Sequence, residues 1–240
     1  MIIKNADESI DLSIIIPALN EGDQISRTLD DINGFLEKKK ISYEIIVIDD
    51  GSLDGTAILA KEHGVHIVIQ NAKPVGKGSA IRLGFSKASG RIILFMDADG
   101  VYNPRDIPRI LEPISKGKAD FVIGSSNIPH YREQSIKFYS IILRKIIKLY
   151  LGIDLDIFSN FKAAKLDTLN KLLPFSSASG DLFDSEIIIL AIKHGFKIVE
   201  IPIRRRLRDY SGYSRSKFSW TLNESILATI SLLRLSFRYG

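Results

Sequence analysis

Two stretches of the 240-residue chain decide its fold: residues 43–56, YEIIVIDDGSLDGT, and residues 91–100, RIILFMDADG. In each stretch an unbroken apolar run ends abruptly in aspartates and glycine. Apolar runs without alternation are typical of strands that are buried on both faces, as in a parallel sheet covered by helices. Open sheets of this kind bind ligands at the carboxyl ends of their strands. We therefore expect these acids to meet a cation, a hydroxyl group or water, because they cannot serve the core.

Strands and helices alternate along the chain. Strands are predicted over residues 12–16, 44–48, 66–69, 92–96 and 121–124, with an outer strand or strand pair over 197–207; helices are predicted over 23–40, 54–63, 77–88, 107–115, 136–151, 181–194 and 218–237. Pro17 is expected to close the first strand, because proline lacks a ladder donor. Asp23 is expected to cap the first helix. The alternation predicts an α/β fold, with a mostly parallel sheet and helices on both faces.

The composition narrows the class of protein. The chain is 45% hydrophobic and 25% charged, which is ordinary for a globular domain. The absence of cysteine excludes disulfides, zinc–thiolate sites and thiol nucleophiles. A net charge of +5 favours phosphorylated ligands, anionic membranes or nucleic acid without choosing among them. We expect no signal peptide, because residues 1–11 carry acids and lack a long apolar core. We expect no spanning helix, because no apolar segment reaches the ~20 residues that spanning requires.

Asp97 and Asp99 flank Ala98 directly after the apolar run of residues 92–96. In an extended segment, residues two apart point to the same side, so both aspartates would face one ligand while Ala98 packs away. A divalent cation relieves the repulsion between two carboxylates, and magnesium takes one or two of them beside water and substrate phosphate. We favour a metal–diphosphate site. The alternative is a solvated turn, which Asp-Ala-Asp-Gly also suits.

Other candidate ligand residues lie at the same predicted rim. Asp50 can accept hydrogen bonds from a base N–H or a ribose hydroxyl, whereas Asp54 is expected to cap the following helix. Asn20 and Glu21 follow the first strand, where simple helix-start chemistry also explains them. Glycines flank Lys77 before a helix and would allow close approach of an anion. The spacing of a P-loop is absent, and no GxGxxG follows the first strand.

Four motifs in this order, IIIPALNE, IDDGSLDGT, GKGSAIRLG and MDADG, resemble the family 2 glycosyltransferases with the GT-A fold. The closer resemblance is to the branch of dolichyl-phosphate mannose synthases and polyprenyl-phosphate glucosyltransferases, and it covers about residues 11–235. It implies a single Rossmann-like GT-A domain over residues 1–240. About residues 11–125 would be the nucleotide-sugar-binding half, and about residues 126–240 an acceptor-side half with an amphipathic helix.

The resemblance also implies roles for individual residues. The nucleotide sugar would be surrounded by Pro17, Ala18, Asn20, Glu21, Asp50, Lys77, Asp97, Ala98 and Asp99. Asp97 and Asp99 would hold a divalent metal, Mg²⁺ or Mn²⁺, and would be catalytic. Arg208, Ser216 and Lys217 would contact the acceptor phosphate. Residues 204–206, all arginine, alternate in direction on a strand, so not all of them can face one ligand; a charge-protected edge strand explains them equally well.

Asp184 and Glu186 resemble the acidic segment that faces the acceptor in this family. Residues two apart do not share a helical face, so at most one of them is expected to reach the site. A favourable charge at a helix N-terminus explains the other. We include Asp184 in the implied catalytic set.

The implied reaction moves a hexose, mannose or glucose, from GDP-mannose or UDP-glucose to a polyprenyl or dolichyl phosphate. A metal on the leaving nucleoside diphosphate would act as a Lewis acid. The acceptor phosphate is already an anion near neutral pH, so a dedicated general base is not required. The implied location is cytoplasmic, peripheral at the cytoplasmic face of a membrane, and the oligomeric state stays open.

Two positions depart from the pattern of the branch. Val101 stands where the branch often has a glutamine that contacts the metal, and Ser126 stands where it often has an arginine. The metal would then carry an extra water, and one expected phosphate contact would be missing. A glycosyltransferase with a non-lipid acceptor, or a non-catalytic relative that binds lipid or a partner, therefore stays open.

Two basic amphipathic helices raise the question of membrane contact. The helices predicted over residues 136–151 and 218–237 would either lie in a membrane interface or pack on the sheet. A pelleting assay with anionic liposomes separates the two, since a lack of binding at low salt excludes the first.

Two other classes fit less well. A nucleotidyltransferase would need a glycine-rich basic signature where PALNE stands. A nucleic-acid-binding domain would interleave basic and aromatic residues, as residues 201–217 partly do, but it leaves Asp-Ala-Asp after a buried strand unexplained. We therefore expect no nucleic-acid partner.

Overall fold

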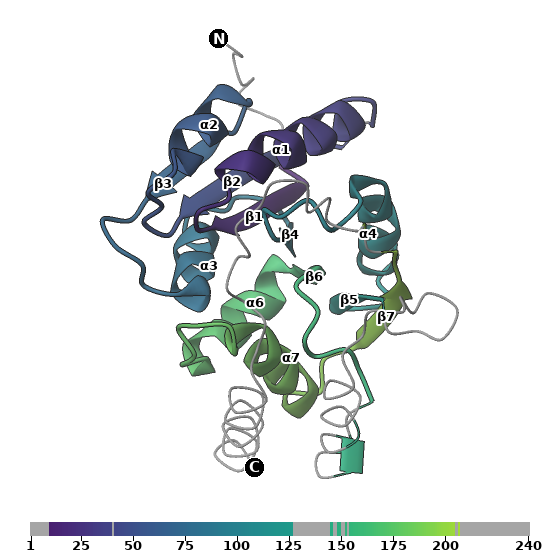
Figure 1. The fold of residues 1–240 in the computed structure, drawn as a ribbon. Helices are drawn as coiled ribbons and strands as arrows, with labels where there is room; N and C mark the ends of the chain where they lie inside the picture. Colours follow the sequence, from purple (N-terminus) through teal and green to yellow (C-terminus); the bar gives the residue numbers. More distant parts are fainter. Residues whose placement is uncertain are drawn as a thin grey trace.

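A computed structural model describes residues 10–39, 41–126, 145, 148–149, 152, 154–204 and 206. Within these residues the centre is a seven-stranded sheet in the order β3-β2-β1-β4-β6-β5-β7 (Figure 1). Its strands are β1 Leu12–Ala18, β2 Tyr43–Asp49, β3 Ile67–Gln70, β4 Ile92–Phe95, β5 Phe121–Ser125, β6 Lys162–Lys165 and β7 Ile198–Pro202. β6 runs antiparallel to both of its neighbours, and the other pairs are parallel. The predicted α/β fold with a mostly parallel sheet is confirmed.

Helices cover both faces of the sheet (Figure 1). They are α1 Gly22–Leu36, α2 Thr56–Glu62, α3 Lys77–Phe85, α4 Ile107–Ser115, α6 Leu166–Leu172 and α7 Phe183–Lys193, with short 3₁₀ turns at Pro104–Asp106 and Leu173–Phe175. Adjacent residues of β1 show the two layers. Ile14 packs in the core cluster that contains α1 and α4, whereas Ile15 packs in the cluster that contains α6 and α7. Both are fully buried, as the unbroken apolar runs predict.

Pro17 does not close the first strand, contrary to our expectation. β1 continues through Pro17, which pairs with Ile48 of β2, and ends at Ala18. The pairing of β1 with β4 ends earlier, at Ile15, whose carbonyl oxygen accepts a hydrogen bond from the Met96 amide. Residues two apart face the same neighbour, so the position of the missing Pro17 N–H faces the β4 side beyond the last β1–β4 pair. The strand therefore loses no ladder hydrogen bond there.

The segment from β6 to the Leu173–Phe175 turn was not predicted. β6 has the sequence KAAK, which is too short and too basic to be recognised as a strand from its apolar content. It is inserted between β4 and β5, so it is a central strand. Of the predicted outer element over residues 197–207, the described part forms the edge strand β7.

Parts of the second half lie outside the described residues. Of the helix predicted over residues 136–151, only Lys145, Lys148 and Leu149 are described, and they are helical and exposed. The helix predicted over residues 218–237 lies wholly outside. Among the helices that are described, none has the length and apolar content to cross a bilayer.

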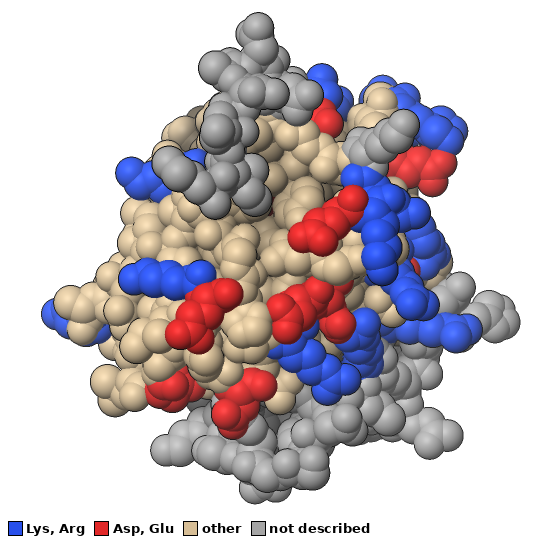
Figure 2. All heavy atoms as spheres, turned by 90° about the horizontal axis from the view of Figure 1, so that it is seen from above, with Lys and Arg blue, Asp and Glu red and all other residues tan. Residues whose placement is uncertain are grey.

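The surface seen from above carries charges of both signs (Figure 2). Over the described part of this face, acidic side chains lie among the basic ones. The described part of this face therefore does not present one uniform basic field.

Candidate active site

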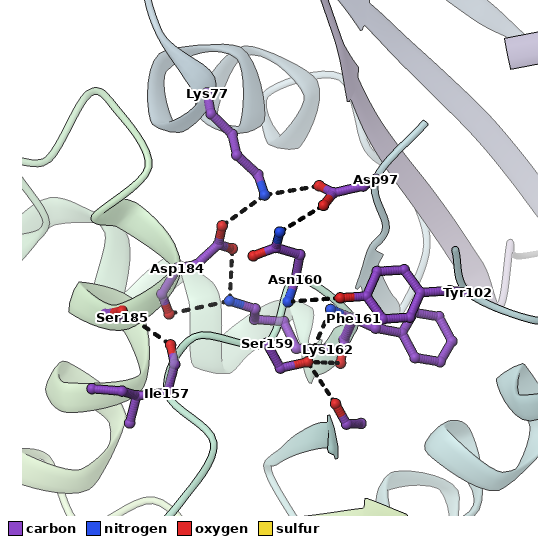
Figure 3. Close-up of polar contacts among 11 residues, drawn as sticks. Lys77, Asp97, Tyr102, Ile157, Ser159, Asn160, Phe161, Lys162, Asp184 and Ser185 are labelled. Atoms are coloured by element: carbon purple, nitrogen blue, oxygen red, sulfur yellow. Dashed lines mark hydrogen bonds and ion pairs between the residues drawn. The ribbon is translucent and has the colours of Figure 1, made fainter. Parts of the chain in front are cut away.

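A cluster of alternating charges lies at the carboxyl rim of the sheet (Figure 3). The Lys77 ammonium, on the first residue of α3, is 2.8 Å from Asp97 Oδ1 and 2.8 Å from Asp184 Oδ2. Asp97 follows β4, and Asp184 lies in the first turn of α7. The fold thus brings together three residues of the predicted site that are far apart in the sequence.

Two further members of this cluster come from the unpredicted β6 region. The Lys162 ammonium is 2.6 Å from Asp184 Oδ1 and 3.1 Å from the Asp184 carbonyl oxygen, and its side chain is fully buried. Asn160 Nδ2 donates to Asp97 Oδ2 at 2.6 Å. These two residues are two apart and lie on the same side, so one short strand start supports both acids of the cluster (Figure 3).

The charges of the cluster shift one another's protonation. Burial works to lower the pKa of Lys77, but the Asp184 and Asp97 carboxylates outweigh it and hold that pKa above its ordinary value. Burial works to raise the pKa of Asp184, but the Lys162 and Lys77 ammonium groups outweigh it and lower that pKa. Burial lowers the pKa of Lys162, and Asp184 opposes this only in part. Asp184 is therefore an ionised group shared by two cations.

Residues 97–99 form a turn and not the extended segment that we expected. β4 ends at Phe95, and Ala98 and Asp99 lie in the turn. Ala98 is buried, as predicted, and its carbonyl oxygen accepts a hydrogen bond of 2.8 Å from the Thr28 hydroxyl of α1. The turn is thus tied to α1 through its middle residue, which leaves the two aspartates on the rim.

The acids at the end of β2, Asp49 and Asp50, serve the protein interior, contrary to our expectation. Asp50 is buried, and its carboxylate accepts hydrogen bonds of 2.9 Å from the Asn71 side chain and from the Val75 and Gly76 amides. Asp49 is also buried; one oxygen accepts from the Ser52 amide at 2.9 Å, and the other has no hydrogen-bond partner among the described residues. Backbone N–H groups of nearby loops make this burial possible. The nucleotide contact of Asp50 stays a prediction.

We expected the glycines beside Lys77 to make room for an anion. They instead make room for the backbone of residues 178–180. A Cβ atom on Gly76 would lie 2.5 Å from the Ser179 carbonyl oxygen, and one on Gly78 would lie 2.5 Å from the Ala178 carbonyl oxygen. The Ser79 amide donates to Ser179 O at 3.0 Å. Gly76 also has φ +99°, which other residues rarely adopt. The start of α3 is therefore sealed against residues 178–180.

Glu186 holds the other side of this contact. Its carboxylate is buried and accepts hydrogen bonds from the amides of Ser177 and Ala178 at 3.0 and 2.9 Å. The Arg82 guanidinium of α3 donates to the Ala178 carbonyl oxygen at 2.7 Å. Only Asp184 of the two acids contacts the charge cluster, as predicted. Glu186 lies in the first turn of α7, where its negative charge is favourable as predicted, and it also anchors the loop at residues 177–178.

Two loops at the rim, after β1 and after β2, are tied together by side chains. The Asn20 amide donates to the Ser52 hydroxyl at 2.8 Å, and Asn20 Oδ1 accepts from the Leu53 amide at 2.9 Å. The Glu21 amide donates to the Thr56 hydroxyl at 3.0 Å. Asn20 has φ +54°, in the left-handed region that asparagine tolerates better than most residues. These contacts place Asn20 and Glu21 at the rim, as predicted.

Asp54 supports the starts of two helices. Oδ2 accepts from the Gly22 amide of α1 at 3.0 Å, and Oδ1 accepts from the Thr56 amide of α2 at 3.1 Å. Asp23, the expected cap of α1, lies inside the first turn, and no cap hydrogen bond from a side chain is made at Glu21. That prediction is wrong, because the cap comes from a distant loop. Burial works to raise the pKa of Asp54, but these hydrogen bonds outweigh it and lower the pKa below its ordinary 3.8.

Replacing Asp54 by alanine is expected to lower the free energy of unfolding by about 1–2 kcal/mol at neutral pH, since two helix starts lose an acceptor. Because the pKa of Asp54 is lower in the folded state, its contribution is complete above the ordinary pKa and is lost as pH falls through the folded pKa. The difference from wild type should therefore shrink at about pH 3. Urea unfolding at both pH values measures it. Asp23→Ala is the control and should cost less than about 0.5 kcal/mol; equal costs would contradict the role of Asp54.

Asp97 and Asp99 fit a divalent metal that is shared with a phosphate. Within the described ranges, no three His, Asp or Glu side chains gather as a metal-binding group. Val101 is buried and offers no oxygen from its side chain. Magnesium commonly takes one or two carboxylates and completes its shell with water and substrate phosphates. A donor set of two aspartates suits that arrangement.

The residues expected at the acceptor phosphate, Arg208, Ser216 and Lys217, lie outside the described residues. Arg206 is described, and its side chain pairs with Asp31 of α1, while its amide donates to the Val101 carbonyl oxygen at 2.7 Å. This arginine is therefore directed at a helix, in agreement with the expectation that residues 204–206 cannot all face one ligand.

Comparison with known families decides the class of protein. The model of the family described as Glycosyl transferase family 2 matches residues 13–180. The chain belongs to this family. The interpretation of the four motifs as those of a family 2 glycosyltransferase is confirmed. This protein is a glycosyltransferase.

Similar proteins narrow the comparison. This glycosyltransferase is 32% identical over 230 residues to the dolichyl-phosphate β-glucosyltransferase of Saccharomyces cerevisiae, covering 82% of this chain and 67% of that protein. It is 31% identical over 205 residues to the polyprenol monophosphomannose synthase of Mycolicibacterium smegmatis, covering 79% and 75% of the two chains.

Solved structures show the same fold. The glucosyl-3-phosphoglycerate synthase of Mycobacterium tuberculosis, in complex with Mn²⁺, UDP and glucosyl-3-phosphoglycerate, superposes with a TM-score of 0.74 at 23% identity. The match covers 96% of this glycosyltransferase and 80% of that chain. The predicted GT-A fold is confirmed.

The sequence of this glycosyltransferase gives little sign of Lys162 and Asn160. Both lie in a short basic stretch without periodicity, and their partners Asp184 and Asp97 are distant in the chain. The signal that was available is indirect: an acid near a helix start, Asp184, that must be neutralised if the helix is buried. α7 is apolar almost all round and is buried, so its acid indicates that some cation lies opposite, but not which residue supplies it.

Proposed function

We propose that this glycosyltransferase moves a hexose from a nucleotide diphosphate sugar to a polyprenyl phosphate. The observation that carries the proposal is the position of Lys77, whose ammonium lies between Asp97 and Asp184 beside the two-aspartate turn. Acids that suit a metal and a cation that suits a diphosphate are thus together at one rim. The acceptor class is supported by two relatives that are named for dolichyl phosphate and polyprenol phosphate.

The residues of the cluster have distinct tasks in this proposal. A divalent metal held by Asp97 and Asp99 would supply positive charge to the leaving diphosphate. Lys77 would add a second positive charge there. Asp184 lies between two ammonium groups, so we assign to it the positioning of Lys77 and not proton abstraction. The acceptor phosphate is an anion near neutral pH and needs no general base.

The finer parts of the proposal concern the donor, the acceptor site and the location. The donor is GDP-mannose or UDP-glucose, with Pro17, Ala18, Asn20, Glu21 and Asp50 around the nucleotide. Arg208, Ser216 and Lys217 hold the acceptor phosphate in the acceptor-side half, about residues 126–240. The enzyme acts at the cytoplasmic face of a membrane, to which its basic amphipathic segments bind peripherally.

A thermal-shift titration with GDP and with UDP, each with and without Mn²⁺ or Mg²⁺, tests the donor site. A ligand in hundredfold excess over its Kd stabilises the folded state by about 2.7 kcal/mol, so one nucleotide should raise the melting temperature by several degrees only when the metal is present. The nucleotide that does so identifies the donor class. A lack of any shift with both nucleotides contradicts the proposed donor site.

The acceptor is tested separately with a labelled nucleotide sugar. Label should enter the organic phase when polyprenyl phosphate is supplied and stay in the aqueous phase when 3-phosphoglycerate is supplied. Transfer only to 3-phosphoglycerate, the acceptor for which the M. tuberculosis structures are named, would replace the lipid acceptor by a soluble one.

A further inference from the structure

The Lys77 cluster is a linear series of four charges, Lys162, Asp184, Lys77 and Asp97, with alternating signs (Figure 3). Every contact in the series is between 2.6 and 2.8 Å. The four formal charges cancel, so the series is neutral as a whole. Asp184 and Lys77 each contact two groups of opposite charge. Removing Lys162 or Asp97 leaves the adjoining residue with only one such contact in the series.

The two acids of the series are held differently. Asp184 has a side chain that is only 4% exposed, and Lys162 binds both its carboxylate and its carbonyl oxygen. Asp97 is 22% exposed, and apart from Lys77 its described partner is the neutral Asn160 amide. The bond from Lys77 to Asp184 is therefore in the fixed, buried part of the series. The bond from Lys77 to Asp97 is in the accessible part.

Asp97 cannot keep Lys77 and accept a divalent cation at no electrostatic cost. Two positive groups on one carboxylate stand only a few ångströms apart, and at such distances like charges repel strongly even with protein screening. The side chain of lysine has rotatable bonds that let the ammonium move while the backbone stays fixed in α3. Movement away from Asp97 is favoured only if another anion receives the ammonium.

We propose that Lys77 is the counter-ion of Asp97 while no metal is bound. When a metal binds, the Lys77 ammonium leaves the Asp97 carboxylate and turns to the diphosphate of the donor, while its contact with Asp184 keeps Lys77 in the site. This inference rests on the proposed function, because it assigns the new anion to the donor. It makes metal and nucleotide binding interdependent. A metal alone must displace the ammonium without giving it a new partner, whereas a metal with a nucleoside diphosphate provides one.

The test is the affinity of the nucleotide-free protein for Mn²⁺, measured by electron paramagnetic resonance of the free ion. Lys77→Gln should bind Mn²⁺ on the order of tenfold or more tightly than wild type, because the competing charge is gone. The same variant should bind nucleoside diphosphate more weakly in the presence of Mn²⁺. Unchanged or weaker Mn²⁺ binding by Lys77→Gln overturns the inference.

Two further variants keep the result interpretable. Lys165→Gln removes a lysine from the same short strand as Lys162, where it pairs with Asp120, and should leave the Mn²⁺ affinity unchanged. Lys77→Arg keeps the positive charge and should stay within about twofold of wild type. A gain in Mn²⁺ affinity by either of these variants overturns the inference, even where Lys77→Gln fails to fold.

The wild-type measurements separate this inference from the function on which it rests. If wild-type protein does not bind Mn²⁺ even when GDP or UDP is added, the proposed donor site fails. If it binds Mn²⁺ together with a nucleotide but Lys77→Gln shows no gain for Mn²⁺ alone, only the role of Lys77 fails.

Discussion

Asp184→Ala is expected to lower the free energy of unfolding by about 3–5 kcal/mol, because it leaves the buried Lys162 ammonium without its carboxylate. Lys77 loses one of its two acids in the same step. A loss of this size is a large part of the stability of a typical domain. Urea unfolding followed by circular dichroism measures it.

The matched control removes the cation as well. By itself, Lys162→Met replaces the buried ammonium by an apolar side chain of similar length and leaves the ion pair between Asp184 and Lys77 in place. The double variant Asp184→Ala with Lys162→Met should be more stable than Asp184→Ala alone, since no unpaired charge stays in the core. A double variant that is less stable than the single one would show that the loss comes from packing and not from the unpaired cation.

Asp97→Asn is expected to lower the rate of sugar transfer by about 10²–10³-fold, because the amide is a poor metal ligand and a poor partner for Lys77. The metal-dependent thermal shift with nucleotide should disappear in the same variant. Sugar transfer at saturating metal and the nucleotide titration are the two measurements.

An exposed acid provides the comparison for Asp97. β6 starts at the active-site rim with Lys162 and runs antiparallel to β4, so Asp167, two residues after β6, lies at the opposite end of the sheet. Asp167→Asn should keep the wild-type rate. If Asp97→Asn also transfers sugar at the wild-type rate with the wild-type metal dependence, Asp97 does not hold the metal.

Local pattern was sufficient for the first half of the fold. The spacing of Ile25, Leu29, Ile32 and Leu36 predicted the buried face of α1, and all four are fully buried. The unbroken runs predicted the central strands, because burial on both faces leaves no polar alternation. Helix 107–115 was predicted with its observed bounds.

Side-chain contacts between residues that are distant in the sequence could not be predicted from local patterns. Asp54 caps α1 across 32 residues, whereas local sequence patterns favour Asp23 in the first turn. Lys162 is buried only because Asp184 lies opposite, and a lysine by itself predicts exposure. Of the candidate site, Lys77, Asp97 and Asp184 were found from the sequence, whereas Asn160 and Lys162 required the tertiary structure.

The insertion of β6 between β4 and β5 has a consequence for how the chain reaches this structure. Until β6 is made, β4 and β5 each present an unpaired edge, and no hydrogen-bonded strand joins them. Residues 160 and 162 arrive with β6, so the strand that joins β4 to β5 also delivers the amide and the ammonium that hold Asp97 and Asp184. A chain that stops after β5 would have the two-aspartate turn but not the groups that orient it. Because Lys162 and Asp184 follow the two-aspartate turn in the chain, the charge cluster can be complete only after β6 and the start of α7 have been synthesised.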